Sequence, residues 1–222
     1  MIPLRDDNPT RTFSWVTILL IALNVAAFLY ELSLPTRQGL EAFFADFALI
    51  PAAVTQTATP EAYRSVFTSM FLHGGWLHLI GNMLYLWIFG NNIEDSVGHF
   101  KFVFFYLLCG IAAAAAQVAT APDSLVPMIG ASGAVSGVLG AYLLLFPRAR
   151  VLVLIPIWII IRFIYVPAWL MLIFWFALQL LSGAASRGQA HGGVAFWAHI
   201  GGFVAGTILI PIFKKRGVRL FQ

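Results

Sequence analysis

Long uncharged apolar stretches alternate with short polar segments along the chain. These stretches cover residues 13–30, 77–92, 102–121, 129–146, 163–181 and 194–213. Each is close to the roughly 20 residues that a helix needs to cross the hydrocarbon core of a bilayer. The pattern therefore predicts an all-α polytopic membrane protein, with six transmembrane helices in a single membrane-embedded domain over residues 1–222.

Two segments between these stretches fit the pattern less well. Residues 151–161 are apolar, but the segment is short, contains Pro156 and is followed by Arg162. We interpret it as the entry to the fifth helix or as a segment in the membrane interface. In the long first connection, residues 41–51 look amphipathic. Such a segment is typical of an interfacial helix, and equally of a helical insertion packed on the bundle.

The composition supports a membrane protein. Of the 222 residues, 60% are hydrophobic and 10% are charged, against about 25% charged residues in an ordinary soluble domain. The first apolar stretch is too long for a signal-peptide core and lacks a clear cleavage site, so we expect a retained helix. No organelle-targeting presequence is evident, which favours a bacterial inner membrane. The single cysteine, Cys109, is expected to be a buried, inert thiol. No basic stripe or glycine-rich phosphate loop indicates a nucleic-acid or nucleotide partner.

The distribution of lysine and arginine predicts the orientation, because cytoplasmic loops carry an excess of these residues. Six helices place both termini on one side, and three basic residues fall on the other: Arg37, Arg64 and Arg187. The side of the termini collects ten, namely Arg5, Arg11, Lys101, Arg148, Arg150, Arg162, Lys214, Lys215, Arg216 and Arg219. We therefore predict cytoplasmic termini. A seventh span at 151–161 would move the basic C-terminus outside and is disfavoured.

Polar residues that are unusual in lipid occur in three of the predicted helices. The second helix carries His78 and Asn82, whose i, i+4 spacing puts them on one face. Ser132 lies at the start of the fourth helix, and His199 lies near the start of the sixth. All three helices run inward, so these residues lie within about 10 Å of the outer end at 1.5 Å per residue. Because polar side chains inside membranes face the bundle or a water-filled cavity, we expect the four to converge.

Glycine pairs predict how two of these helices pack. The fourth helix contains Gly133 and Gly137, and the sixth contains Gly202 and Gly206. Such small-xxx-small pairs let membrane helices approach backbone to backbone. Packing through them would bring the serine and the histidine within hydrogen-bond reach. The glycines alone fit helix packing without chemistry just as well.

Taken together, the converging residues have a chemical logic. A serine is a weak nucleophile until a neighbouring base takes its proton, and neutral His199 can do so and later protonate the leaving amine. The Ser132 backbone N–H, the Asn82 amide and the His78 imidazole could stabilise an oxyanion. These helices offer no acidic residue to orient His199, so we predict a Ser–His dyad. Taken singly, Ser132 fits a helix cap, His199 a structural histidine and Asn82 a hydrogen bond between helices.

Three motifs in this order resemble the signature of the rhomboid intramembrane serine proteases. They are residues 67–84 (Phe-Thr-Ser-Met-Phe-Leu-His-Gly-Gly-Trp-Leu-His-Leu-Ile-Gly-Asn-Met-Leu), Gly-Ala-Ser-Gly at 130–133 and Ala-His-Ile-Gly-Gly at 198–202. The similarity extends over nearly the whole chain. It implies a bacterial-type, six-helix rhomboid-like bundle that cleaves transmembrane segments near the outer side of the bilayer. Transmembrane protein substrates and membrane lipids are the implied partners, and no metal or cofactor is implied.

The resemblance also implies roles for individual residues. Ser132 matches the nucleophile and His199 the base, while Asn82 and His78 match the residues on the oxyanion side. His73 matches a structural histidine at the end of the first loop. The supporting glycines are Gly130, Gly133, Gly202 and Gly206. The fifth helix and residues 182–195 correspond to a lateral gate and cap.

Two positions depart from the pattern of some family members. Ser136 stands where those members carry a tyrosine that stacks on the catalytic histidine. Either Ser136 hydrogen-bonds to His199, or another aromatic residue takes the stacking role. In the first loop, Tyr63 and Arg64 stand near the place of a Trp-Arg pair that anchors the loop.

Three other functions are weighed against an intramembrane serine endopeptidase. A metalloprotein is disfavoured because the five histidines form no His-Glu-x-x-His motif. A non-catalytic relative that escorts membrane proteins would typically lack the serine or the histidine. A transporter or channel would need a continuous polar path, whereas the cytoplasmic halves of these helices are almost wholly apolar.

Overall fold

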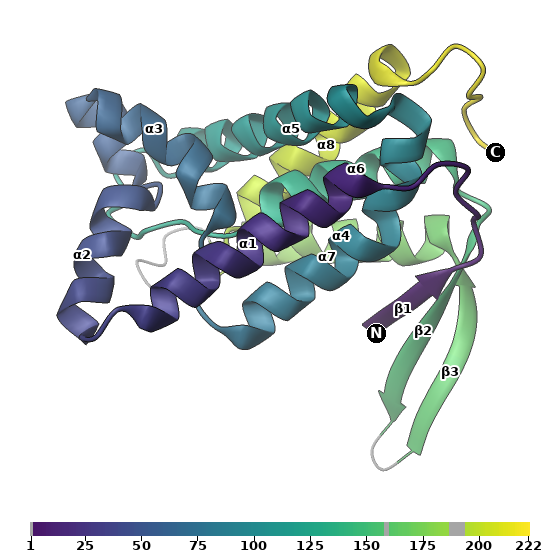
Figure 1. The fold of residues 1–222 in the computed structure, drawn as a ribbon, viewed down its shortest axis with the longest axis horizontal. Helices are drawn as coiled ribbons and strands as arrows, with labels where there is room; N and C mark the ends of the chain where they lie inside the picture. Colours follow the sequence, from purple (N-terminus) through teal and green to yellow (C-terminus); the bar gives the residue numbers. More distant parts are fainter. Residues whose placement is uncertain (1, 158–159, 187–193) are drawn as a thin grey trace.

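Helices dominate the computed structural model, which describes residues 2–157, 160–186 and 194–222. The bundle is built from α1 (Trp15–Ser33), α4 (Trp76–Val97), α5 (His99–Thr120), α6 (Ser132–Leu145), α7 (Ala168–Ala185) and α8 (Phe196–Phe213). The first connection folds into α2 (Arg37–Phe47), η1 (Ala53–Thr57), α3 (Pro60–Thr68) and η2 (Ser69–Phe71). Figure 1 shows α2 and α3 at one end of the bundle and both chain termini towards the other.

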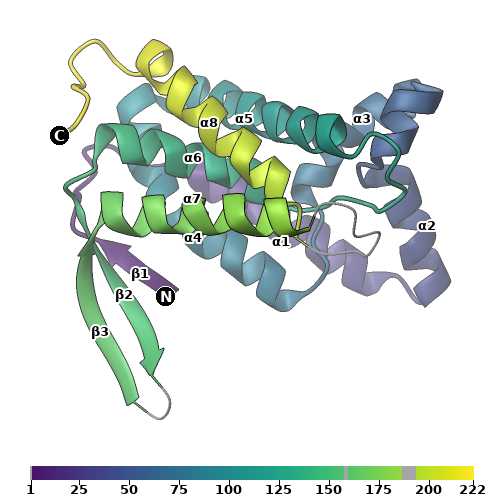
Figure 2. The same cartoon turned by 180° about the vertical axis from the view of Figure 1, so that it is seen from behind.

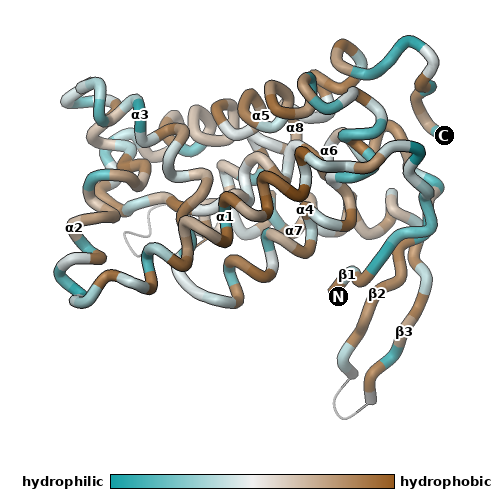
Figure 3. The backbone as a smooth tube through the Cα atoms, in the orientation of Figure 1, coloured by the Kyte–Doolittle hydropathy of each residue, from teal (hydrophilic) through white to brown (hydrophobic). Residues whose placement is uncertain are grey.

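Four of the described helices are long and apolar enough to cross a membrane, namely α1, α5, α7 and α8. α6 is apolar but has 14 residues. α4 has 22 residues but ends in a polar turn that contains Glu94 and Asp95. Large apolar side chains such as Trp169, Ile173 and Leu181 of α7 are exposed, and Figure 3 shows the bundle helices as mainly hydrophobic. The chain is therefore a mostly helical membrane protein.

The segment between α6 and α7 differs from the prediction. It forms β2 (Arg150–Ile157) and β3 (Ile160–Pro167), which pair antiparallel, and β1 (Ile2–Asp6) joins β2 to complete a three-stranded sheet. The expectation of helix over 163–181 is wrong for 163–167, and the all-α prediction misses this sheet, which projects from the bundle in Figure 1. The segment is rich in β-branched residues, which favour strands, and the N-terminal strand supplies its hydrogen-bond partners. Hydrophobicity alone does not separate a buried strand from a helix.

The sheet is attached to the bundle near both termini. Tyr142 of α6 donates a hydrogen bond to the carboxylate of Asp6 in β1. Val151 and Val153 of β2 are fully buried. Burial raises the pKa of Asp6 to about 6, although the hydrogen bond from Tyr142 opposes this shift.

α6 lies at the centre of the bundle, and its contact with α8 runs through glycines. A Cβ atom built on Gly202 would overlap the carbonyl oxygen of Gly133, and one built on Gly206 would overlap that of Gly137. Only glycine allows backbones to approach this closely. The predicted packing of these two helices is confirmed. Because it fixes the first turn of α8 against the first turn of α6, it determines where His199 lies relative to Ser132.

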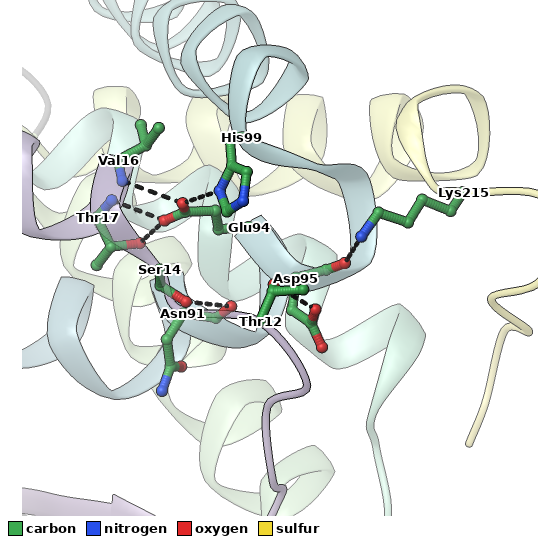
Figure 4. Close-up of polar contacts among 9 residues, drawn as sticks. All are labelled: Thr12, Ser14, Val16, Thr17, Asn91, Glu94, Asp95, His99 and Lys215. Carbon is green, nitrogen blue, oxygen red and sulfur yellow. Dashed lines mark hydrogen bonds and ion pairs between the residues drawn. The ribbon is translucent and has the colours of Figure 1, made fainter.

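A buried carboxylate joins α1 to α4. Glu94 accepts hydrogen bonds from the backbone N–H groups of Val16 and Thr17, at 3.0 and 2.7 Å, and from the Thr17 hydroxyl at 2.7 Å. The Nδ1 atom of His99 lies 2.6 Å from the same carboxylate. These contacts, drawn in Figure 4, satisfy N–H groups at the start of α1 that have no partner within the helix.

Candidate active site

Ser132 and His199 lie within hydrogen-bond distance. Ser132 is the first residue of α6, and His199 lies in the first turn of α8. The Ser132 Oγ atom is 2.8 Å from Nε2 of His199. The imidazole is largely buried, since His199 is 9% exposed. This is the geometry in which an imidazole can accept a proton from a serine hydroxyl.

The other ring nitrogen of His199 contacts a residue that the sequence reasoning missed. Gln179 of α7 places Oε1 2.8 Å from Nδ1 of His199. Its side-chain amide also donates a weak hydrogen bond, at 3.5 Å, to the backbone oxygen of Trp175. The signal in the sequence was a lone amide within an otherwise apolar predicted helix, since such residues usually face the bundle interior.

An aromatic residue from α7 lies against the imidazole. The rings of Trp175 and His199 have centroids 5.9 Å apart and an interplanar angle of 33°. Ser136 instead donates a hydrogen bond to the backbone oxygen of Ser132, at 2.6 Å. Of the two expectations for the position four residues after Ser132, the hydrogen bond from Ser136 to His199 is not formed, and an aromatic residue, Trp175, instead lies beside the imidazole at a tilt.

His78 and Asn82 of α4 lie beside the segment that leads to Ser132. A Cβ atom built on Gly130 would be 2.6 Å from Nε2 of His78 and 3.6 Å from Nδ2 of Asn82. Gly130 has a φ of +120°, which favours glycine. Both the conformation and the close approach therefore require glycine here.

Each of these two side chains presents a nitrogen that can donate. Gly74 donates its backbone N–H to Nδ1 of His78 at 3.4 Å, so a neutral ring carries its proton on Nε2, towards Gly130. The Nδ2 atom of Asn82 is buried and has no hydrogen-bond partner among the described residues. An unpaired buried donor costs stability, and this nitrogen is free to donate to a group bound in its vicinity.

A cavity connects these groups. Its volume is about 1300 Å³, and its walls include His78, Asn82, Gly130, Ser132, Trp175 and His199. The remaining walls come mainly from small and apolar residues of α4, α5, α6 and α8. The cavity can therefore admit an extended peptide segment beside the serine. Within the described ranges, no group of three or more His, Cys, Asp or Glu side chains could hold a metal ion.

His73 and Arg64 support the first connection from outside the cavity. The backbone N–H of His73 donates to Glu31 of α1 at 3.1 Å, and the His73 ring lies 5.0 Å from that of His78. Burial, and to a lesser degree the neighbouring His78, lower the pKa of His73 to about 4. Arg64 donates to the Asp46 backbone oxygen at 3.2 Å and covers the Phe47 ring. Both residues thus hold segments together rather than face a substrate.

Comparison with known proteins identifies relatives of the chain. The Rhomboid domain profile matches residues 60–216, well over half of the chain. The chain is 33% identical to the mitochondrial Rhomboid protein 1 of Saccharomyces cerevisiae, over 65% of this chain and 40% of that protein. It is 32% identical to Rhomboid-like protease 5 of Toxoplasma gondii, over 73% of this chain and 17% of that protein. Rhomboid protease GluP of Bacillus subtilis is 41% identical over 34% of this chain and 14% of its own length.

The matched relatives come from bacteria and eukaryotes, and two of the three are named as proteases. The chain spans 40% or less of the length of each of these relatives. The profile match covers the segment with Ser132, His199, His78 and Asn82. The chain belongs to the rhomboid family.

Proposed function

We propose that the protein is an intramembrane serine endopeptidase that cleaves transmembrane segments of other membrane proteins. The observation that carries this proposal is the 2.8 Å contact between Ser132 Oγ and His199 Nε2, at the edge of a cavity large enough for a peptide. Homology to rhomboid proteases supports the same reaction.

In the proposed reaction, Ser132 Oγ attacks the substrate carbonyl carbon while His199 Nε2 takes the hydroxyl proton. In this proposal three donors stabilise the resulting oxyanion: the Ser132 backbone N–H, Asn82 Nδ2 and His78 Nε2. When the C–N bond breaks, His199 protonates the leaving amine. A water molecule then attacks the acyl-enzyme with His199 again as the base, which restores Ser132.

The proposed membrane arrangement has six spans: α1, α4, α5, α6, α7 and α8. Ser132 and His199 both lie at the starts of their helices, at the end of the bundle away from the termini. With cytoplasmic termini, as the basic residues indicate, the reaction occurs near the outer side of the bilayer. We further propose a bacterial inner membrane as the location.

A fluorophosphonate probe, which reacts with activated serines, tests the proposal on the detergent-purified protein. We expect wild type to be labelled and Ser132→Ala and His199→Ala to remain unlabelled, while each variant still shows a cooperative thermal unfolding transition. Ser33→Ala, at an exposed serine of α1, is the matched control and should label like wild type. Labelling that persists in Ser132→Ala would overturn the assignment of the nucleophile. A folded wild type that neither labels nor cleaves a substrate in lipid would indicate a non-catalytic escort protein.

A further inference from the structure

We propose that Gln179 is a positioning residue for His199, an inference that rests on the proposed role of His199 as the general base. The amide oxygen of Gln179 lies 2.8 Å from Nδ1 of His199, on the side of the ring opposite to Ser132. The two hydrogen bonds together place the ring between α6 and α7. The dyad predicted from the sequence is thus completed by a neutral third group on a different helix.

The contact with Gln179 selects one tautomer of the His199 imidazole. A neutral imidazole carries one proton, and the nitrogen without it is the one that can accept the serine proton. Because Oε1 of Gln179 can only accept, its contact with Nδ1 requires the proton to be there. Nε2 then has a free lone pair at 2.8 Å from Ser132 Oγ. Gln179 therefore selects the form of His199 that can act as a base.

The backbone oxygen of Trp175 determines the orientation of the Gln179 amide. The amide nitrogen lies 3.5 Å from the backbone oxygen of Trp175. Rotating the amide by half a turn would turn its oxygen towards that carbonyl oxygen, a repulsive contact, and its N–H₂ group towards Nδ1 of His199, which would then have to be unprotonated. Because Gln179 is only 9% exposed, water offers little compensation for the repulsion between the two oxygens.

Two side chains of α7 hold the imidazole of His199. Gln179 and Trp175 are four residues apart and share one face of α7. Gln179 holds the edge of the imidazole, and the Trp175 ring lies against it. α7 lies beside α8 on the face of the bundle seen in Figure 2. The seating of α7 against α8 therefore sets the orientation of the base.

Substitutions at Gln179 separate positioning from packing. Gln179→Met keeps the length of the side chain but removes the acceptor, whereas Gln179→Glu keeps the acceptor and adds a charge. If Gln179 positions His199, Gln179→Met should slow fluorophosphonate labelling at saturating probe by about 10- to 100-fold, the loss typical of removing a group that orients a metal-bound histidine, with little change in probe affinity. The Gln179→Glu variant should be labelled faster than the Gln179→Met variant. If Gln179 only fills space in an apolar bundle, Gln179→Met should keep the wild-type labelling rate and Gln179→Glu should not.

The pH profile gives a second readout of the same variants. A carboxylate beside Nδ1 stabilises the imidazolium, so the acidic limb of the labelling rate should move to higher pH in Gln179→Glu than in wild type. If Gln179 only packs in the bundle, the acidic limb of the pH profile should stay where it is in wild type. Leu178→Met, at an exposed neighbour on α7, is the matched control and should label at the wild-type rate. Equal rates for Gln179→Met and wild type would overturn the proposal.

A measurement that needs no activity keeps this proposal separate from the proposed function. In ¹⁵N-histidine NMR spectra, the His199 signals are assigned by their loss in His199→Ala, and the nitrogen shifts report which ring nitrogen carries the proton. We expect the proton on Nδ1 in wild type and a mixture of tautomers in Gln179→Met. A proton on Nε2 in wild type, or the same tautomer in both proteins, would overturn the role of Gln179. Absence of labelling in wild type would instead contradict the nucleophile.

Discussion

Gly202 of α8 lies so close to Gly133 of α6 that any side chain at position 202 would overlap the Gly133 carbonyl oxygen. Gly202→Ala should therefore push α8 away from α6 and carry His199 away from Ser132. Overpacking of this kind costs about 1–3 kcal/mol. We expect a lower thermal midpoint in detergent and slower fluorophosphonate labelling. Gly81→Ala, where a Cβ atom meets nothing within 4 Å, is the control for stability, and equal midpoints for the two variants would contradict this packing.

Asn82 is predicted to act on turnover rather than on stability. Its Nδ2 atom is buried without a partner among the described residues, as a donor reserved for a transient oxyanion would be. Asn82→Ala should lower kcat by about 10²- to 10³-fold, the cost of losing one oxyanion donor, and leave KM almost unchanged. The midpoint temperature of thermal unfolding should not fall, because an unpaired buried donor contributes no hydrogen bond to the folded state. A change in KM alone would remove Asn82 from this role.

Trp175 is predicted to support the imidazole through its ring. Trp175→Phe keeps an aromatic face beside His199, whereas Trp175→Leu removes it. An aromatic contact is worth about 0.5–1.5 kcal/mol beyond its buried area, which corresponds to roughly two- to tenfold in rate. The labelling rate should therefore be highest for wild type, lower for Trp175→Phe and lowest for Trp175→Leu. Equal rates for Phe and Leu would show that only the volume of Trp175 matters.

His73 makes stability depend on pH. Its pKa is lowered by burial from 6.5 to about 4, so the folded protein holds it neutral while the unfolded chain protonates it. Since the unfolded state binds the extra proton between these values, the contribution to stability is complete above about pH 6.5 and is lost as the pH falls towards 4. His73→Leu keeps the backbone N–H that donates to Glu31 and should flatten the decline of the denaturation midpoint between pH 7 and 4. If the denaturation midpoint of His73→Leu falls with pH as in wild type, other titratable groups cause the pH dependence.

Glu94 is predicted to be needed for the stability of the bundle. Its carboxylate accepts from two backbone N–H groups and one hydroxyl at the start of α1. Glu94→Gln would present an N–H₂ group to some of these donors and leave a buried donor unpaired, which costs about 1–3 kcal/mol. Thermal unfolding measures the loss. Glu41→Gln, whose partner Arg37 is exposed, should have little effect, so equal losses would contradict the role of Glu94.

The helices that carry the candidate site were predicted within a few residues of their observed ends. The second helix was expected over 77–92 and extends to Val97, so that Glu94 reaches α1. Apolar stretches bounded by polar residues identify such helices because length and hydrophobicity are local properties. In the first connection, the amphipathic segment predicted over 41–51 overlaps α2, whereas η1, α3 and η2 and the strands after α6 were not predicted. Residues 187–193, within the expected cap, lie outside the described residues.

The sequence also identified the residues of the candidate site, but not the residues that contact them. Ser132, His199, His78 and Asn82 stand out because polar residues near the ends of apolar helices are unusual. The prediction of a dyad rests on the lack of acidic residues in the helices of the site, whereas Gln179 is neutral and lies on α7. The family pattern places an aromatic residue four positions after Ser132, on the same helix. Here Trp175 contacts His199 from α7, a different helix.

The amino-acid sequence by itself determined the class of membrane protein, the family motifs and the glycine pairs that let α6 and α8 approach. Those features depend on hydrophobicity and spacing along one segment. Only the tertiary structure decided that residues 150–157 pair with the N-terminal strand, and that Gln179 and Trp175 hold His199. Both depend on contacts between segments far apart in the chain, where packing in three dimensions, rather than local periodicity, selects the partner.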